Sequence, residues 1–183
     1  MVKSAPPLFR RWVVSNSLGV LGGLALGHVA SSIWLSYQAS HNAGAAINPL
    51  GMVLMFGLLT GATIGLAQWD VLRRYQPRLK GWVMITILGM VTGHLIMMPL
   101  GSEAIAPSDD PWAAFILTIL NWTGVGVLLG FGQSLLLKRY FTQWWCWILA
   151  SSLGAFFATL AIFTAMLGIA LLRVIQEKNH PLR

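Results

Sequence analysis

The chain has 183 residues, of which 56% are hydrophobic and 9% are charged, and its formal net charge is +7. A charged share so far below the roughly 25% of soluble domains excludes most soluble classes. The positive charge does not indicate nucleic acid binding, because the basic residues fall in short turns between apolar runs long enough to cross a bilayer. The single cysteine, Cys146, excludes an internal disulfide.

Five apolar runs predict five transmembrane helices in a single integral membrane domain, residues 1–183. Each run can cross about 30 Å of hydrocarbon at about 1.5 Å per residue, and a helix satisfies every backbone polar group in lipid. The expected fold class is therefore an all-α polytopic bundle. The first run has a basic start like a signal peptide, but it is too long for one, and we expect it to be retained. The predicted spans are residues 12–37, 49–72, 82–100, 112–137 and 144–172.

The second and third spans are repeated by the fourth and fifth. Residues 61–95 align without a gap to residues 126–160, at an offset of 65. Repeat 1 covers about 49–100 and repeat 2 about 112–172, which predicts two parallel helical hairpins, and 12–37 is an extra N-terminal span. The first span shares with the third and fifth a tryptophan followed seven residues later by glycine; the pairs are Trp12/Gly19, Trp82/Gly89 and Trp147/Gly154.

Lysine and arginine are unevenly divided between the two ends of the predicted bundle. Nine of the twelve fall on the side of the N-terminus and three on the other side. Because cytoplasmic segments carry the excess of basic residues, we expect the N-terminus to be cytoplasmic and the C-terminus external or lumenal. The nine are Lys3, Arg10, Arg11, Arg73, Arg74, Arg78, Lys80, Lys138 and Arg139, and the three are Arg173, Lys178 and Arg183.

Tryptophan is abundant and gathers near the ends of the predicted spans. Seven of the nine tryptophans lie at or near such an end. Indole rings favour the interface between hydrocarbon and water, so the pattern predicts an aromatic belt. The seven are Trp12, Trp34, Trp69, Trp82, Trp112, Trp144 and Trp145.

Small residues recur at a spacing of four in every span. Such ladders let helix backbones approach closely where lipid gives no hydrophobic drive for association. We expect them to be packing faces, with an interface for another protein as the functional alternative. The predicted packing glycines are Gly19, Gly23, Gly57, Gly61, Gly65, Gly89, Gly93, Gly126, Gly130 and Gly154.

Gln68 and Gln133 are the repeated polar residues within the spans. At about 100° per residue, Gln68 shares the face of the glycine ladder and points into protein. We expect an interhelical hydrogen bond, either to a neighbouring carbonyl or between the two glutamines; the alternative is contact with a cofactor or substrate. Asp70 has Arg73 and Arg74 three and four positions further on, which predicts a local ion pair.

His28 and His94 lie well inside spans and off the glycine faces. A polar ring facing lipid is costly, so each is expected to meet a partner. The simplest partner is a hydrogen-bonding group on another helix. The alternative is a haem iron or a chlorophyll magnesium, which neutral imidazole can ligate. The expectation is that no cofactor is bound.

No nucleophile elbow, phosphate-binding loop or His-Glu metal motif occurs in the sequence. The predicted function is therefore non-enzymatic: an accessory, scaffold or assembly subunit that packs with itself or with a larger membrane complex. A pigment- or haem-binding subunit that uses His28 and His94 is the first alternative. A small-solute permease is the second, and it is disfavoured because no span carries charges at the membrane midplane.

The string Gly-x-x-x-Gly-x-x-Gln-Trp-x-x-Leu-Arg-Arg at residues 61–74, with a weaker copy around Gln133, resembles a loose group of uncharacterised polytopic membrane proteins found mainly in cyanobacteria and related bacteria. The resemblance covers residues 61–95 and 126–160. It implies no activity. It does imply a location in the plasma membrane or thylakoid membrane of a bacterium.

Overall fold

The computed structural model describes residues 6–41, 49–105 and 110–179. Those residues form five α-helices, each long and apolar enough to cross a membrane. The predicted all-α polytopic fold is therefore confirmed. The helices are α1 (Pro6–His41), α2 (Pro49–Tyr75), α3 (Trp82–Ile105), α4 (Pro111–Leu137) and α5 (Trp145–Asn179).

Local sequence sets several helix ends. Pro111 occupies the first turn of α4, and the Asp110 side chain accepts a hydrogen bond from the Trp112 backbone N–H at 2.9 Å. Gly81 precedes α3 with a φ of +87°, which residues with a side chain rarely adopt. Helices α1, α2, α3 and α5 run past the predicted spans, because the end of an apolar run marks the edge of the hydrocarbon and not the end of the helix.

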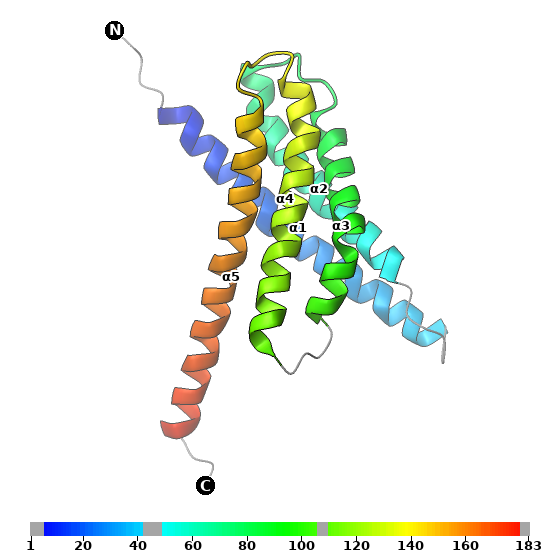
Figure 1. Ribbon diagram of the computed structural model, residues 1–183, viewed down its shortest axis with the longest axis vertical. Coiled ribbons are helices and arrows are strands. Elements are labelled where there is room, and N and C mark those ends of the chain that lie inside the picture. The colour runs from blue at the N-terminus through cyan, green and yellow to red at the C-terminus, as the bar shows by residue number, and fades with distance from the viewer. Residues whose placement is uncertain (1–5, 42–48, 106–109, 180–183) are drawn as a thin grey trace.

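The helices pack in chain order, α1 on α2, α2 on α3, α3 on α4 and α4 on α5. This order is consistent with the two predicted hairpins, α2–α3 and α4–α5. Within the described ranges, the backbones of α1 and α5 make no contact. In the view of Figure 1 the two ribbons cross in their first turns and then diverge toward the other end of the bundle.

The α2–α3 and α4–α5 turns lie at the same end of the bundle as the start of α1 (Figure 1). That end, called the basic end below, carries the basic residues of 10–11, 73–80 and 138–139. Lys3, Asp109 and Arg183 lie outside the described residues. Because successive helices run in opposite directions, the start of α1 and the turns after α2 and α4 share one end, and so do the basic residues that they carry.

Glycines make the helix interfaces close. A Cβ at Gly61 would lie 2.8 Å from the Ile87 Cα, and one at Gly126 would lie 3.2 Å from the Ser152 Cα. Gly126 and Ser152 each stand 65 residues after Gly61 and Ile87, so the two contacts are equivalent in the repeat. These separations are tighter than ordinary van der Waals contact, so a side chain at either position would force the helices apart. Similar backbone approaches, at 3.0–3.3 Å, occur at Gly19, Gly23, Gly57, Gly65, Gly89, Gly93 and Gly130.

Gly154 is the exception among the ten predicted packing glycines. No atom lies within 4 Å of a Cβ built there, among the residues that the structure describes. Its counterparts Gly19 and Gly89 each meet a neighbouring helix, at Ile64 and Leu129 respectively. The corresponding face of α5 is thus open.

The interior is small and combines apolar side chains such as Leu79, Trp82 and Met90 with several polar ones, whereas many large apolar side chains cover the outside. Leu58 and Leu153 are about half exposed, and Leu18 is about two thirds exposed. Such a distribution suits a bilayer, because burying apolar surface away from lipid gains no hydrophobic free energy. Close packing and hydrogen bonds hold the helices together instead. The fully or nearly buried polar residues include Thr60, Gln68, Thr86, Gln133 and Ser134.

Candidate functional site

The two glutamines meet in the centre of the bundle. Gln68 on α2 is 7% exposed and Gln133 on α4 is 1% exposed. The Gln133 Nε2 donates a hydrogen bond to the Gln68 Oε1 at 2.9 Å. The interhelical hydrogen bond expected from the sequence is therefore present, and it joins the two glutamines directly.

Each glutamine also accepts a hydrogen bond from a tryptophan on the next helix. The Trp82 Nε1 donates to the Gln68 Oε1 at 2.9 Å, and the Trp147 Nε1 donates to the Gln133 Oε1 at 2.7 Å. Both pairs are 14 residues apart. Trp82 is 1% exposed, so its assignment to the aromatic belt was wrong: the buried amide of Gln68 gives the indole N–H a partner inside the protein.

Each glutamine donates, in turn, to a polar side chain on the preceding helix. The Gln68 Nε2 donates to the Asn16 Oδ1 at 2.8 Å, and the Gln133 Nε2 donates to the Thr86 Oγ1 at 2.9 Å. Asn16 follows Trp12 by four residues, and Thr86 follows Trp82 by four. The same spacing after Trp147 leads to Ser151.

These hydrogen-bonding partners were not predicted from the sequence. The pattern that could have found them is Trp-x-x-x-polar-x-x-Gly, which occurs in α1, α3 and α5. One helical turn separates the tryptophan from the polar residue, so both lie on the same side of the helix. On α3 they serve different glutamines, because Trp82 donates to Gln68 and Thr86 accepts from Gln133. In the text below, an amide unit is a glutamine that accepts from one such tryptophan and donates to one such polar residue.

Trp12 and Ser151 occupy the third set of these positions without a glutamine between them. Neither the Trp12 indole N–H nor the Ser151 hydroxyl has a hydrogen-bonding partner in the described part of the chain. The Trp12 ring contacts the Trp147 ring, with centroids 5.5 Å apart, and Trp147 contacts Trp82 at 5.7 Å. The three equivalent tryptophans thus gather near the basic end.

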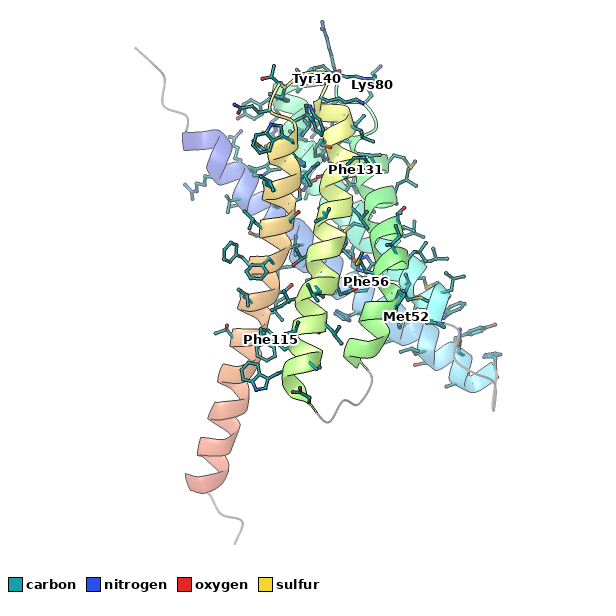
Figure 2. All side chains as sticks on the ribbon, in the orientation of Figure 1. Met52, Phe56, Lys80, Phe115, Phe131 and Tyr140 are labelled. Atoms are coloured by element: carbon teal, nitrogen blue, oxygen red, sulfur yellow. The ribbon has the colours of Figure 1, made fainter. Side chains whose placement is uncertain are left out.

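A groove of about 690 Å³ lies between α1 and α5 and is backed by α2, α3 and α4. The Trp12–Trp147 contact lies toward the basic end of this groove. Toward the other end, Phe115 packs on Phe163 with ring centroids 4.1 Å apart, and Figure 2 shows Phe115 between the lower parts of α4 and α5. The polar side chains that line the groove include Asn16, Gln68, Gln133 and Ser151, and the open Gly154 also faces it.

His28 and His94 are brought to the same aromatic side chain. The Phe56 ring centroid lies 5.3 Å from that of His28 and 5.1 Å from that of His94. Because Phe56 packs against both rings, a porphyrin shared between the two histidines would have to displace it. The sequence-based hypothesis of one haem bound by both histidines therefore does not fit this packing.

His94 taken alone has a free nitrogen. Its Nδ1 donates to the Met90 carbonyl at 2.8 Å, whereas its buried Nε2 has no hydrogen-bonding partner in the described ranges. Trp122 packs on the same ring with centroids 5.4 Å apart. His28 is exposed and lines the groove.

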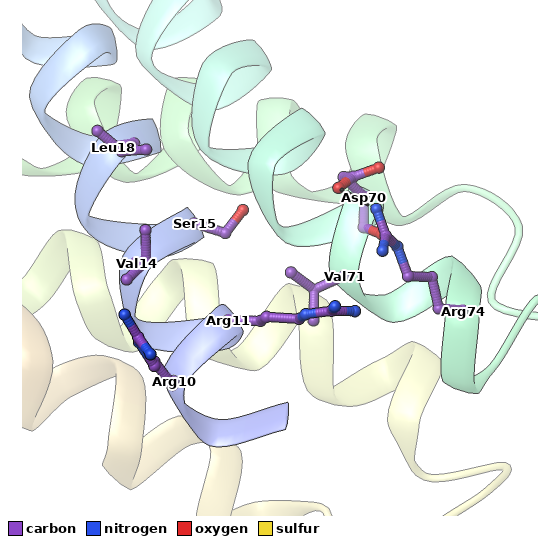
Figure 3. A pocket seen from close by; sticks show the side chains of 8 residues that line it. All are labelled: Arg10, Arg11, Val14, Ser15, Leu18, Asp70, Val71 and Arg74. Carbon is purple, nitrogen blue, oxygen red and sulfur yellow. Dashed lines mark hydrogen bonds and ion pairs between the residues drawn. The ribbon is translucent and has the colours of Figure 1, made fainter. Parts of the chain in front are cut away.

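A second cavity, of about 620 Å³, lies between α1 and α2 at the basic end. Figure 3 shows the Arg11 side chain extending from α1 toward Val71 on α2. Asp70 lines this cavity and forms ion pairs with Arg73 at 2.5 Å and Arg74 at 3.2 Å. The predicted ion pair is therefore confirmed, and it accounts for the acidic residue within this otherwise basic surface.

Comparison with protein-family models, curated proteins and solved structures found no match to this chain. Among the described residues, no group of three or more histidine, cysteine, aspartate or glutamate side chains could hold a metal ion. The candidate site is the network of hydrogen bonds around Gln68 and Gln133, near the basic end of the groove between α1 and α5. Its side chains can form hydrogen bonds within the membrane.

Proposed function

We propose that this protein is a non-enzymatic accessory or scaffold subunit, and that the groove between α1 and α5 packs against a transmembrane helix of a larger membrane assembly. The observation that carries the proposal is the open face at Gly154. The same face of α1, at Gly19, is covered by α2, and that of α3, at Gly89, is covered by α4.

The side chains of the groove support helix packing over simple exposure to lipid. Val13 and Leu21 on α1 do not line the groove, but both are exposed. Aligning Trp12 with Trp82, 70 residues further on, makes them the counterparts of Val83 and Val91, which pack on α2. In the groove itself, hydroxyl, amide and indole groups face a space that acyl chains would otherwise fill. Polar groups without partners are costly in hydrocarbon, which favours an occupant that can hydrogen-bond.

The proposed topology places the N-terminus in the cytoplasm and the C-terminus outside or in a lumen. The unequal division of lysine and arginine between the two ends supports this orientation. The resemblance of residues 61–74 to membrane proteins of cyanobacteria supports a bacterial plasma or thylakoid membrane.

The proposed function can be tested with the variant Gly154→Leu, and Gly22→Leu is its matched control. Nothing lies within 4 Å of a Cβ at either position, so neither leucine should lower the melting temperature of the purified protein. Gly154 lines the groove and Gly22 does not.

In mildly solubilised membranes, the natural protein and Gly22→Leu should run as a complex larger than the single chain. Gly154→Leu should run as the single chain, because its side chain fills the contact face. A Gly154→Leu protein that keeps the full complex mass, or a natural protein that always runs alone, would contradict the proposal.

A second candidate function is pigment binding at His94. The imidazole is held through Nδ1 by a backbone carbonyl while Nε2 is left free, which is how metal-ligating histidines are usually oriented. Visible absorbance of the purified protein that disappears in a His94→Leu variant would support it. A colourless natural protein, purified in a detergent that preserves its fold, would contradict it.

A further inference from the structure

We infer that the helix bound in the groove carries a glutamine of its own, and that this side chain completes a third amide unit with Trp12 and Ser151. The inference rests on the proposed lateral packing function and adds the chemistry of the partner. It identifies the partner by one glutamine side chain, which lies at the membrane depth of Trp12 and Ser151.

The two complete amide units define what the third one needs. In each, one glutamine joins a tryptophan N–H on one neighbouring helix to a polar oxygen on the other, over donor–acceptor distances of 2.7–2.9 Å. Gln68 is flanked in this way by α3 and α1, and Gln133 by α5 and α3. The next position in the series is flanked by α1, which supplies Trp12, and α5, which supplies Ser151.

Both flanking groups are in place, and among the described residues neither has a hydrogen-bonding partner. Trp12 and Ser151 line the same groove, and neither has a hydrogen bond within the part of the chain that the structure describes. A side-chain amide is the group that fits between them, because it can accept from the indole N–H and donate to the hydroxyl at once. A purely apolar helix would leave both groups unsatisfied.

The direction and spacing of the partner follow from α2 and α4. Both run toward the basic end, opposite to their neighbours, and each carries glycines three and seven positions before its glutamine. Those glycines face the helix that supplies the tryptophan. The partner is therefore expected to run toward the basic end and to carry small-x-x-x-small-x-x-Gln.

A second copy of this chain does not supply such a helix. Its α2 is covered by α1 and α3, and its α4 by α3 and α5, so neither glutamine helix is free without unfolding the donor. A lipid acyl chain has no group for Trp12 or Ser151. The occupant we propose is a transmembrane helix of a different protein.

The inference can be tested with the full-length protein in lipid nanodiscs and a synthetic peptide as the probe. A peptide with the sequence of residues 111–138 contains Gly126, Gly130 and Gln133 in the required pattern. A donor dye is placed at its C-terminus, and an acceptor dye on Cys146, the exposed single cysteine near the basic end of α5. Energy transfer then measures both binding and orientation.

Energy transfer should saturate with added peptide, and it should fall when the donor is moved to the N-terminus of the peptide, about 40 Å away along the helix. A Gln133→Leu peptide should bind about eightfold more weakly, because it loses both hydrogen bonds, and the natural peptide should bind a Trp12→Phe protein about threefold more weakly, because one is lost. The two changes together should cost little more than Gln133→Leu alone, since that peptide has no amide left for Trp12. Trp112→Phe, at a tryptophan that is 70% exposed, is the matched control and should leave affinity unchanged.

Equal affinity of the natural and Gln133→Leu peptides would overturn the inference about the amide. If Gly154→Leu in the protein still abolished peptide binding, the proposed packing function would survive that result. Energy transfer that does not saturate with added peptide would mean that lipid fills the groove. Energy transfer between labelled copies of the protein would identify a second copy as the occupant, provided that added peptide does not reduce it. Either of those two results would overturn the proposed partner.

Discussion

Replacing Gln133 by leucine should destabilise the bundle more than any other change of one buried polar side chain to an apolar one of similar size. Gln133 makes three hydrogen bonds, with Gln68, Thr86 and Trp147, and is 1% exposed. At about 0.6 kcal/mol for an average hydrogen bond inside a membrane, their loss amounts to about 2 kcal/mol.

The partners left behind raise or limit that cost. The Gln68 Oε1 keeps its hydrogen bond from Trp82, and the Thr86 hydroxyl keeps its donation to the Trp82 carbonyl at 2.8 Å. The Trp147 N–H, which is partly buried, is left without a partner, and this adds to the loss, because an unsatisfied donor costs about 1–3 kcal/mol when it is fully buried. We therefore expect Gln133→Leu to lower the free energy of unfolding by about 2–4 kcal/mol.

Equilibrium unfolding in mixed micelles, followed by tryptophan fluorescence, measures this loss. Gln143→Leu, at an exposed position in the α4–α5 turn, is the matched control and should change stability by less than about 0.5 kcal/mol. In a double-mutant cycle with Trp147→Phe, the coupling should be about 0.6–1.7 kcal/mol. Losses that simply add, or a Gln133→Leu protein as stable as Gln143→Leu, would refute the reasoning.

Three further predictions concern packing, topology and surface charge. Gly61→Leu should cost about 1–3 kcal/mol or prevent folding, because its Cβ would lie 2.8 Å from backbone, whereas Gly22→Leu should leave the melting temperature unchanged; equal losses would contradict the packing argument. Reporter fusions after Tyr75 should read cytoplasmic and those after Asp110 external, and the reverse pattern would overturn the orientation. Asp70→Asn should cost under about 1 kcal/mol in thermal unfolding, since its ion pairs are about half exposed and solvent-screened.

Much of the fold could be predicted from the sequence, because the signals involved are local. The length of an apolar run and the lack of water in a bilayer are enough to predict a spanning helix, which is why all five helices were anticipated. Gln68 and Gln133 could be chosen for the same reason: a polar side chain on the small-residue face of a helix must find a partner inside the protein. Asp70 and its arginines lie within one helical turn, so their ion pair was also a local matter.

The tertiary structure decided which helix faces which, because lipid gives apolar surfaces no preference among neighbours. The sequence alone put Trp82 in an aromatic belt, and only the approach of α3 to α2 shows that its N–H serves Gln68. The meeting of His28 and His94 at Phe56 depends on how α1 and α3 lie against α2. The ladder that includes Gly154 has the same pattern as those that include Gly19 and Gly89, and only the packing of the five described helices leaves it open. Residue pattern determined the faces that can pack, and the number of helices available determined which of those faces are covered.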